Sequence, residues 1–369
     1  MIPAAPRYGS GALADLAGSL LARLGLPDAA DVLGLPETEK ACLLLVDGLG
    51  WELLREHRDK APFLASLAAD RGPLTAGFPS TTATSISSIG TGRPCGEHGI
   101  VGYSFAVGDG AVLNALNWSE DVIPERLQPL PSLFERAAEA GIGAHVVSPA
   151  ELEGSGLTHA VLRGARFHGT YALGDLVSAS HAALREPGPQ YCYAYHADLD
   201  KLGHLYGPGS DPWCHQLVHV DRLAAALAEG LPAGGLLAVT ADHGMIEAGD
   251  RVDYDHTPEL ADGVRTLAGE PRMRHVYPEQ GAAGQVYAAW RELLGDRAWV
   301  VRREEAIEAG WFGPRVAEHV RPRIGDVLAA ARGDTIVTRS ETELMSRFPG
   351  QHGSLTSAEL DVPLLLARG

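Results

Sequence analysis

Carboxylate and imidazole side chains recur in four short segments of this 369-residue sequence, at spacings that suit a metal site. In DKLGH two of them lie four residues apart and share one face if the segment is helical, and in ADHGM two are adjacent. Carboxylate oxygen and imidazole nitrogen together suit Zn²⁺ or Mn²⁺ better than Ca²⁺ or Mg²⁺, and six ligands are enough for two ions. The candidates are Asp47 in VDGLG, Asp200 and His204 in DKLGH, Asp242 and His243 in ADHGM, and His352 in GQHGS.

Each candidate also has an ordinary structural interpretation. Asp47 precedes a glycine and could be a turn residue, while Asp200 and His204 could be a solvated pair on a helix. The pair Asp242–His243 is more specific, because a buried strand end tolerates two ionisable residues only if they are paired or liganded. As adjacent residues at a strand end, these two side chains could also diverge toward two neighbouring sites.

A second pattern is the run of hydroxyl residues from Phe78 to Thr91, FPSTTATSISSIGT. Two isoleucines within it have helical spacing, so we expect a short turn followed by a helix that begins near Thr82. The N-terminus of a helix presents unpaired N–H groups and the positive end of its dipole, which together can hold an anion. A cluster of capping hydroxyls without chemistry is the alternative, and this stretch alone does not decide between the two.

The elements that must position these residues form an alternating pattern. Apolar runs of strand length alternate with helical patterns, and several of the runs end in the polar residues described above. This pattern predicts an α/β fold with a mostly parallel central sheet flanked by helices on both faces, and a site at the carboxyl ends of its strands. Strands are expected at 41–46, 144–147, 191–195, 235–240 and 362–366, and helices at 12–24, 132–140, 173–184 and 214–228.

The stretch 254–346 breaks this alternation with several prolines and a mixture of short helical and strand patterns. We interpret it as an inserted α+β cap subdomain, with helices at 281–294 and 316–320 and a strand at 298–301. Residues 1–253 and 347–369 would then form the catalytic α/β core.

Charge and composition exclude several function classes. The balance of 30 basic against 47 acidic residues gives a net charge of −17, which argues against binding to a nucleic-acid polymer or to an anionic membrane. The four cysteines have no CxxC spacing, so neither a disulfide framework nor a cysteine-ligated zinc site is indicated. Without a convincing signal peptide or an 18-residue apolar run, we expect a cytoplasmic protein, of undetermined oligomeric state.

Taken in order, the motifs DG, FPSTTATSISSIGTG, DKLGHLYGP, ADHGM and a late HG resemble the alkaline-phosphatase superfamily. The branch they resemble is the type I phosphodiesterase/nucleotide pyrophosphatase family. The resemblance implies an alkaline-phosphatase-like fold, two divalent metal ions (Zn²⁺, with Mn²⁺ as the alternative) and Thr82 as a nucleophile that becomes transiently phosphorylated. It further implies that one ion is held by Asp47, Asp242, His243 and the Thr82 oxygen, and the other by Asp200, His204 and His352.

Ser85 is the main departure from the family pattern. It lies one helical turn after Thr82, at the position we expect to contact a phosphoryl oxygen, where its hydroxyl can donate one hydrogen bond but has a shorter reach than an amide. Thr81 and Asp198 are the second choices for the nucleophile and for the first ligand of DKLGH. Both fit the motif spacing less well.

The predicted activity is hydrolysis of a phosphodiester or pyrophosphate bond in a small, nucleotide-type phosphate ester. Within the superfamily, a phosphomonoesterase is the main alternative and a phosphomutase is a further one. A catalytically silent metal-binding protein would be a different class of function. The leaving group stays open, because the segments expected to set specificity (103–118, 206–213 and 254–346) match no ligand motif.

Overall fold

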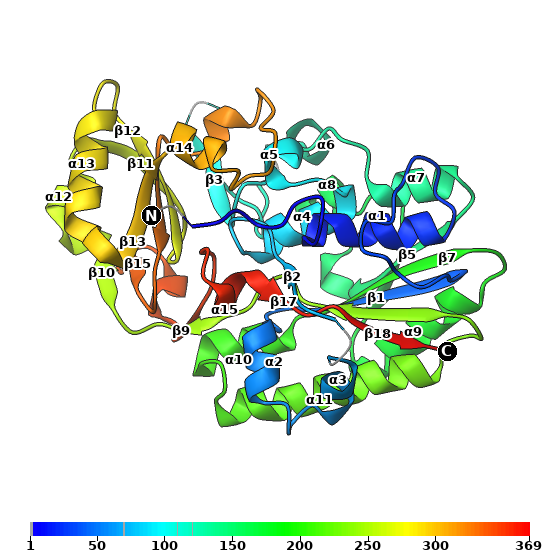
Figure 1. Cartoon of the computed structure of the whole chain (residues 1–369). Coiled ribbons are helices and arrows are strands. Elements are labelled where there is room, and N and C mark those ends of the chain that lie inside the picture. Colours follow the sequence, from blue (N-terminus) through cyan, green and yellow to red (C-terminus); the bar gives the residue numbers. More distant parts are fainter. Residues whose placement is uncertain (1–2, 69–70, 109, 120) are drawn as a thin grey trace.

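The computed structural model describes residues 3–68, 71–108, 110–119 and 121–369 (Figure 1). Its centre is a six-stranded sheet in the order β18-β8-β1-β7-β5-β6. All neighbouring strands run parallel except β18, which pairs antiparallel with β8. The strands are β1 (Lys40–Val46), β5 (Gly143–Pro149), β6 (Arg166–Thr170), β7 (Gln190–His196), β8 (Leu236–Thr240) and β18 (Leu365–Arg368).

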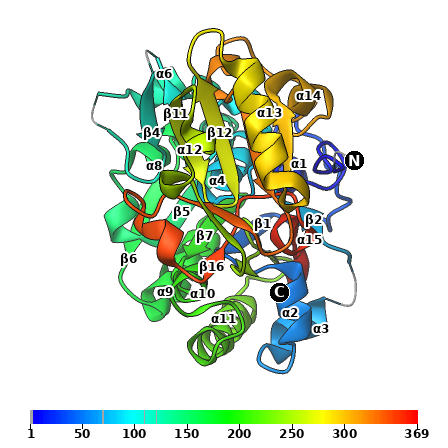
Figure 2. The same cartoon turned by 90° about the vertical axis from the view of Figure 1, so that its left-hand side faces the viewer.

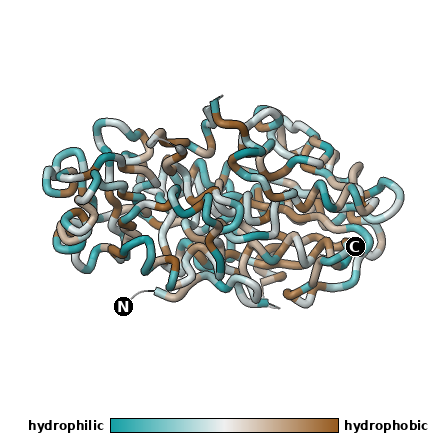
Figure 3. The backbone as a smooth tube through the Cα atoms, turned by 90° about the horizontal axis from the view of Figure 1, so that it is seen from above, coloured by the Kyte–Doolittle hydropathy of each residue, from teal (hydrophilic) through white to brown (hydrophobic). Residues whose placement is uncertain are grey.

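Helices cover both faces of this sheet, which buries the central strands on both sides. Figure 3 shows apolar residues gathered mostly in the interior of the molecule and hydrophilic ones mostly at its periphery. The predicted α/β architecture is therefore confirmed. One face carries α1 (Leu13–Arg23), α4 (Thr82–Thr91), α7 (Leu133–Glu139) and α8 (Gly156–Val161), and the other α2 (Trp51–Glu56), α3 (Pro62–Leu67), α9 (Leu173–Arg185), α10 (Asp198–Tyr206) and α11 (Asp211–Glu229).

A second, antiparallel sheet lies beside the first and faces the viewer in Figure 2. Its order is β11-β12-β14-β13, and α13 (Ala283–Leu294) packs on it through the buried Trp290. All four strands fall within the predicted insert 254–346, although the boundary of that subdomain stays a prediction. The strands are β11 (Val264–Glu270), β12 (Met273–Pro278), β13 (Ala298–Arg302) and β14 (Val327–Ala331).

The remaining elements are short. Four pairs of small strands are β2 (Leu74–Thr75) with β17 (Asp361–Val362), β3 (Ser104–Val107) with β4 (Ala111–Asn114), β9 (Ile246–Glu247) with β16 (Gly350–Gln351), and β10 (Arg251–Asp253) with β15 (Ile336–Thr338). Short helices are α5 (Cys95–His98), α6 (Pro124–Leu127), α12 (Pro258–Ala261), α14 (Arg303–Glu308) and α15 (Ser357–Leu360). No helix among the described residues is long and apolar enough to cross a membrane.

A buried ion pair joins the second sheet to helix α15. Arg272, in the turn between β11 and β12, donates from Nη2 to Oε2 of Glu359 in α15 at 2.6 Å, and both side chains are 0% exposed. A charge pair taken out of water is stable only when its geometry is good and its other polar atoms are satisfied. Arg272 meets this condition through the carbonyl oxygens of Thr335 and Ala331.

Two predicted elements differ in the structure. The stretch 316–320 is not helical, because the N–H of Ala317 donates to the carbonyl of Gly96 instead of to a carbonyl one turn earlier. The predicted strand 362–366 is divided into β17 and β18 at Pro363, which has no N–H for a ladder.

Candidate active site

The carboxyl ends of two adjacent parallel strands carry half of the predicted ligands. Asp47 follows β1, and Asp242 and His243 follow β8, which pairs with β1. The glycines of both motifs permit close packing: a Cβ on Gly48 would lie 3.0 Å from Cα of Asp200, and one on Gly244 would lie 2.0 Å from the carbonyl oxygen of Ala358. Glycine is therefore required where these turns pass their neighbours.

Asp47, Asp242 and His243 form a group that we call the inner cluster. Nε2 of His243 lies 3.4 Å from Oδ1 of Asp47 and 3.3 Å from Oδ2 of Asp242. The backbone N–H groups of Gly48 and His243 donate to Oδ1 of Asp242 at 3.1 and 3.0 Å. Asp242 and His243 thus point into one site, and the interpretation that they diverge toward two sites is wrong.

Asp200, His204 and His352 form a second group, the outer cluster. Nε2 of His204 lies 3.3 Å from Oδ2 of Asp200 and 3.2 Å from Nε2 of His352. The first two residues come from α10, and His352 comes from the segment after β16. The rings of His352 and His243 stack with centroids 3.5 Å apart, so the two clusters adjoin.

All three histidines are oriented in the same way. Each directs Nδ1 toward a backbone carbonyl, which fixes the proton on Nδ1 and leaves the Nε2 lone pair facing its cluster. Two such lone pairs face each other across 3.2 Å in the outer cluster, an arrangement that needs a cation or a proton between them. The acceptors are the carbonyl oxygens of Gly350 for His204 at 2.7 Å, Gly244 for His243 at 2.9 Å and Ser80 for His352 at 2.9 Å.

The carboxylates of both clusters have unused lone pairs. Within the described residues, Oδ1 of Asp47, Oδ1 of Asp200 and Oδ2 of Asp242 are buried and have no hydrogen-bond partner. Burial, together with the charges of the other two aspartates, raises the pKa of Asp47 well above its ordinary value. Burial and two neighbouring imidazoles hold the pKa of His352 well below its ordinary value, so it is neutral. Neutral imidazoles and unpaired carboxylate oxygens are the donor set that divalent cations take.

Thr82 is the hydroxyl that lies at the clusters. It is the first residue of α4, and its Oγ1 is 3.3 Å from Nε2 of His243. Thr81, the second choice for the nucleophile, is the N-cap residue before α4, and its side chain makes no capping hydrogen bond. Asp198, the second choice for the first ligand of DKLGH, is exposed and lies outside both clusters. The Ser85 hydroxyl donates to the carbonyl of Asp242 at 2.7 Å. Because a hydroxyl has one proton to donate, the predicted phosphoryl contact of Ser85 would require this bond to break.

Thr82 lines two pockets. The larger, of about 830 Å³, also borders His352 and His204, and the smaller, of about 260 Å³, also borders Asp47. Both volumes suit small-molecule groups rather than a polymer. Thr82 and Asp200 line both pockets, so these residues stand where the pockets meet.

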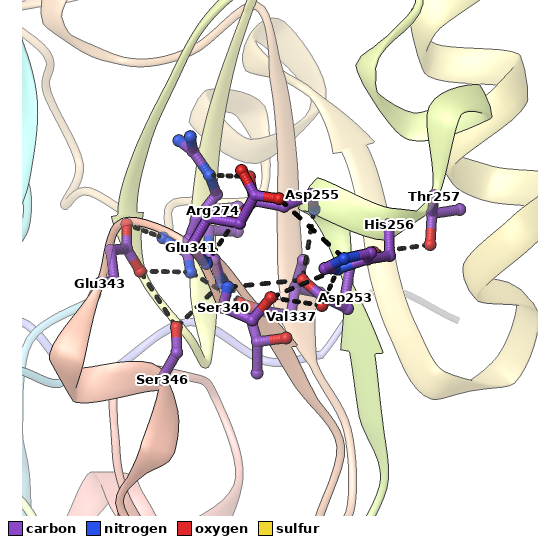
Figure 4. Close-up of polar contacts among 12 residues, drawn as sticks. Asp253, Asp255, His256, Thr257, Arg274, Val337, Ser340, Glu341, Glu343 and Ser346 are labelled. Atoms are coloured by element: carbon purple, nitrogen blue, oxygen red, sulfur yellow. Dashed lines mark hydrogen bonds and ion pairs between the residues drawn. The ribbon is translucent and has the colours of Figure 1, made fainter.

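One wall of the larger pocket is held by charged contacts from the second sheet and the strands beside it (Figure 4). Arg274 pairs with Glu343 at 2.7 Å, and Arg339 donates to Asp255 at 2.8 Å. Ser340 donates to Oδ2 of Asp253 at 2.6 Å rather than to a free nitrogen of His256, so this group is not a serine nucleophile with its base. The contacts fix the backbone of 339–348 over the pocket.

Sequence patterns did not reveal two residues of the site. The hydroxyl of Tyr195, in β7, donates to Oδ2 of Asp47. Glu270, at the end of β11, lines the larger pocket beside Thr81, and burial raises its pKa to about 8. Tyr195 could have been found as the last tyrosine of an alternating strand next to the site. Glu270 had no signal, because its burial depends on the packing of the two sheets.

The family model for type I phosphodiesterase / nucleotide pyrophosphatase matches residues 41–355. This range includes Thr82 and all six candidate ligands, and the chain belongs to this family. The predicted membership of the type I phosphodiesterase/nucleotide pyrophosphatase family is therefore confirmed.

Two solved structures share the fold. An inactive form of murine ectonucleotide pyrophosphatase / phosphodiesterase 5 in complex with AMP has a TM-score of 0.70 and 19% identity, over 89% of this chain and 87% of that one. Phosphonoacetate hydrolase from Sinorhizobium meliloti with phosphonoacetate has a TM-score of 0.67 and 22% identity, over 89% and 90%. A curated relative, phosphopentomutase from Anaeromyxobacter dehalogenans, is 27% identical over 173 residues. This match covers 45% of the chain and 42% of the mutase, so the chain spans less than half the length of that relative.

Proposed function

We propose that this protein hydrolyses a phosphodiester or pyrophosphate bond of a small molecule, with Thr82 as the nucleophile. The observation that carries the proposal is the position of its hydroxyl, 3.3 Å from Nε2 of His243 and at the junction of two pockets. Membership of the family supports the reaction class, and the two pockets support the choice of ester.

We infer two divalent ions, with Zn²⁺ preferred over Mn²⁺. The inner cluster and Thr82 would hold one, and the outer cluster would hold the other. The three buried carboxylate oxygens without partners and the three Nε2 lone pairs support this assignment. When bound, such ions lower the pKa of a coordinated alcohol and neutralise charge on phosphoryl oxygens.

The chain's own residues account for the displacement. The Thr82 oxygen loses its proton to solvent and attacks phosphorus, the leaving ester oxygen departs with its bonding pair and takes up a proton, and a threonyl phosphoester remains. Water then attacks the same phosphorus and loses a proton, the bond from phosphorus to the Thr82 oxygen breaks, and the Thr82 oxygen takes up a proton to restore the hydroxyl. The Thr81 side chain does not cap α4, so N–H groups of its first turn can donate to phosphoryl oxygens, a role for which Ser85 is a further candidate.

The pockets favour a diester over a monoester. A phosphorus atom at Thr82 would have room for one substituent in the pocket of about 830 Å³ and for another in the pocket of about 260 Å³. A monoesterase or phosphomutase is the second candidate, and the phosphopentomutase relative favours it. Parallel rates on a nitrophenyl phosphate monoester and a bis-nitrophenyl diester distinguish the two. Monoester turnover more than about tenfold faster, a difference of about 1.4 kcal/mol in barrier, would overturn the diester proposal.

Thr82→Ala tests the nucleophile, with Thr81→Ala as the matched control. We expect Thr82→Ala to lower kcat by at least about a thousandfold, because the covalent route is lost, and Thr81→Ala to lower it by less than about tenfold. Full activity in Thr82→Ala would show that another group attacks. If metal-loaded protein hydrolysed no phosphate ester at all, the catalytically silent binding protein would be the correct reading.

A further inference from the structure

Exposed apolar side chains gather at the larger pocket. Val112, Leu116, Leu205 and Leu344 all line it, and they are 44%, 49%, 43% and 67% exposed. They come from three separate segments: β4 and the loop after it, the end of α10, and the wall 339–348. Single exposed apolar residues are ordinary, but several that converge on one pocket indicate a binding surface.

The wall that carries Leu344 is held in place. The adjacent Glu343 is paired with Arg274, and Arg339 and Ser340 are bonded to Asp255 and Asp253 (Figure 4). Leu344 therefore projects from an anchored segment. Such a side chain would be expected to be polar unless an apolar group covers it.

The charges around the pocket disfavour a substrate with several phosphates. Among the described residues that line the two pockets, Lys201 is the only lysine or arginine. The larger pocket also borders the carboxyl groups of Glu270 and Glu343. Enzymes that bind triphosphates surround the additional phosphates with cations or with N–H donors. Here a second or third phosphate would find Lys201 as its one cation among the described lining residues. Its other neighbours would be apolar side chains, the buried Glu270 and Glu343, which is already paired with Arg274.

We propose that the substrate is a phosphodiester in which one ester group is an apolar alkyl chain, bound by Val112, Leu116, Leu205 and Leu344. This proposal rests on the proposed diester hydrolysis at Thr82 and names its substrate class. The phosphodiester group lies at Thr82, and the chain leads out along the apolar rim of the larger pocket. A nucleoside triphosphate is correspondingly a poor substrate.

A series of alkyl 4-nitrophenyl phosphodiesters (methyl, butyl, octyl), used below micelle-forming concentrations with the metal-loaded enzyme, tests the proposal. We expect kcat/KM to rise by up to about fourfold for each methylene that becomes buried. In the double variant Leu116→Ser/Leu344→Ser, kcat/KM should be lower than in the wild type, and this loss should grow with chain length. Val32→Ser is the matched control, because Val32 is 47% exposed and does not line the pocket.

The outcomes separate the two proposals. Hydrolysis of the methyl ester tests diester chemistry, and the dependence on chain length tests the apolar subsite. Binding of the same series to Thr82→Ala, measured by isothermal titration calorimetry, gives this dependence without turnover. Affinity and kcat/KM that do not change with chain length would overturn the subsite. The subsite would also be overturned if the double variant depended on chain length as strongly as the wild type does. A concentration-dependent dimer that the double variant abolishes, with no dependence on chain length, would overturn it too.

Discussion

The inner and outer clusters contain the same kinds of ligand but differ in burial and in support. The side chains of Asp47, Asp242 and His243 are 4%, 0% and 0% exposed, whereas those of Asp200, His204 and His352 are 15%, 11% and 8% exposed. The inner ligands follow adjacent strands whose register fixes their separation. The outer ligands come from a helix and a loop segment beside the larger pocket. The inner cluster is therefore the more rigid of the two, beside the proposed nucleophile Thr82, and the outer cluster is the more accessible from the larger pocket.

Equivalent substitutions in the two clusters should show the largest difference. We expect Asp242→Asn to lower kcat by about a thousandfold or more, because Asp242 contacts His243, which in turn contacts Thr82. Asp200→Asn should lower kcat by about a hundredfold. Inductively coupled plasma mass spectrometry should find less bound metal in both variants. Asp198→Asn, two residues from Asp200 but exposed, is the control. Equal metal content and activity in all three variants would contradict the assignment of ligands.

The attachment of the second sheet to α15 can be tested through Arg272. We expect Arg272→Met to lower the free energy of unfolding by about 3–5 kcal/mol, because it leaves the fully buried Glu359 without its partner. Denaturant unfolding gives this value. Arg332→Met should cost less than about 1 kcal/mol, since Arg332 is 43% exposed and its partner Asp296 is exposed too. Equal losses of unfolding free energy in the two variants would mean that the buried pair Arg272–Glu359 contributes little to stability.

Glu270 should give the most gradual effect, a dependence of stability on pH. Burial raises its pKa from 4.5 to about 8, so its contribution to stability is fully present below pH 4.5 and is lost as the pH rises toward 8. Glutamine does not titrate. The stability of the wild type relative to Glu270→Gln should therefore fall from about pH 5 to about pH 8, by at most about 1.4 kcal/mol per pH unit. Denaturant unfolding across that range measures it, and a constant difference would refute the buried acid.

The sequence was sufficient where function depends on short local motifs. The glycines after Asp47 and His243 have a local reason, since only glycine fits those turns, and the motifs identify the family. Central strands such as β1 are buried on both faces and therefore read as apolar runs. The grouping of the six candidates agrees with the division that the resemblance implies, while their role as ligands and the cytoplasmic location stay predictions.

The sequence was not sufficient where a role depends on which segments meet. Glu270 and Leu344 have no distinctive neighbours, and only the packing of the second sheet against the core makes one a buried acid and the other part of a pocket rim. The hydrogen bond from Ser85 to Asp242 crosses between α4 and the segment after β8, so local spacing could not predict it. Pro363 explains why the predicted strand 362–366 is divided in two, whereas the apolar run alone had indicated one continuous strand.

The most direct test of the central claim is rapid-quench mass spectrometry of the metal-loaded enzyme with a diester substrate. Within the first turnover, the tryptic peptide that contains Thr82 should gain the phosphoryl group together with its remaining ester, and fragmentation should assign the adduct to the Thr82 oxygen. A burst of leaving group with the adduct on another side chain, Thr81 included, would contradict the account.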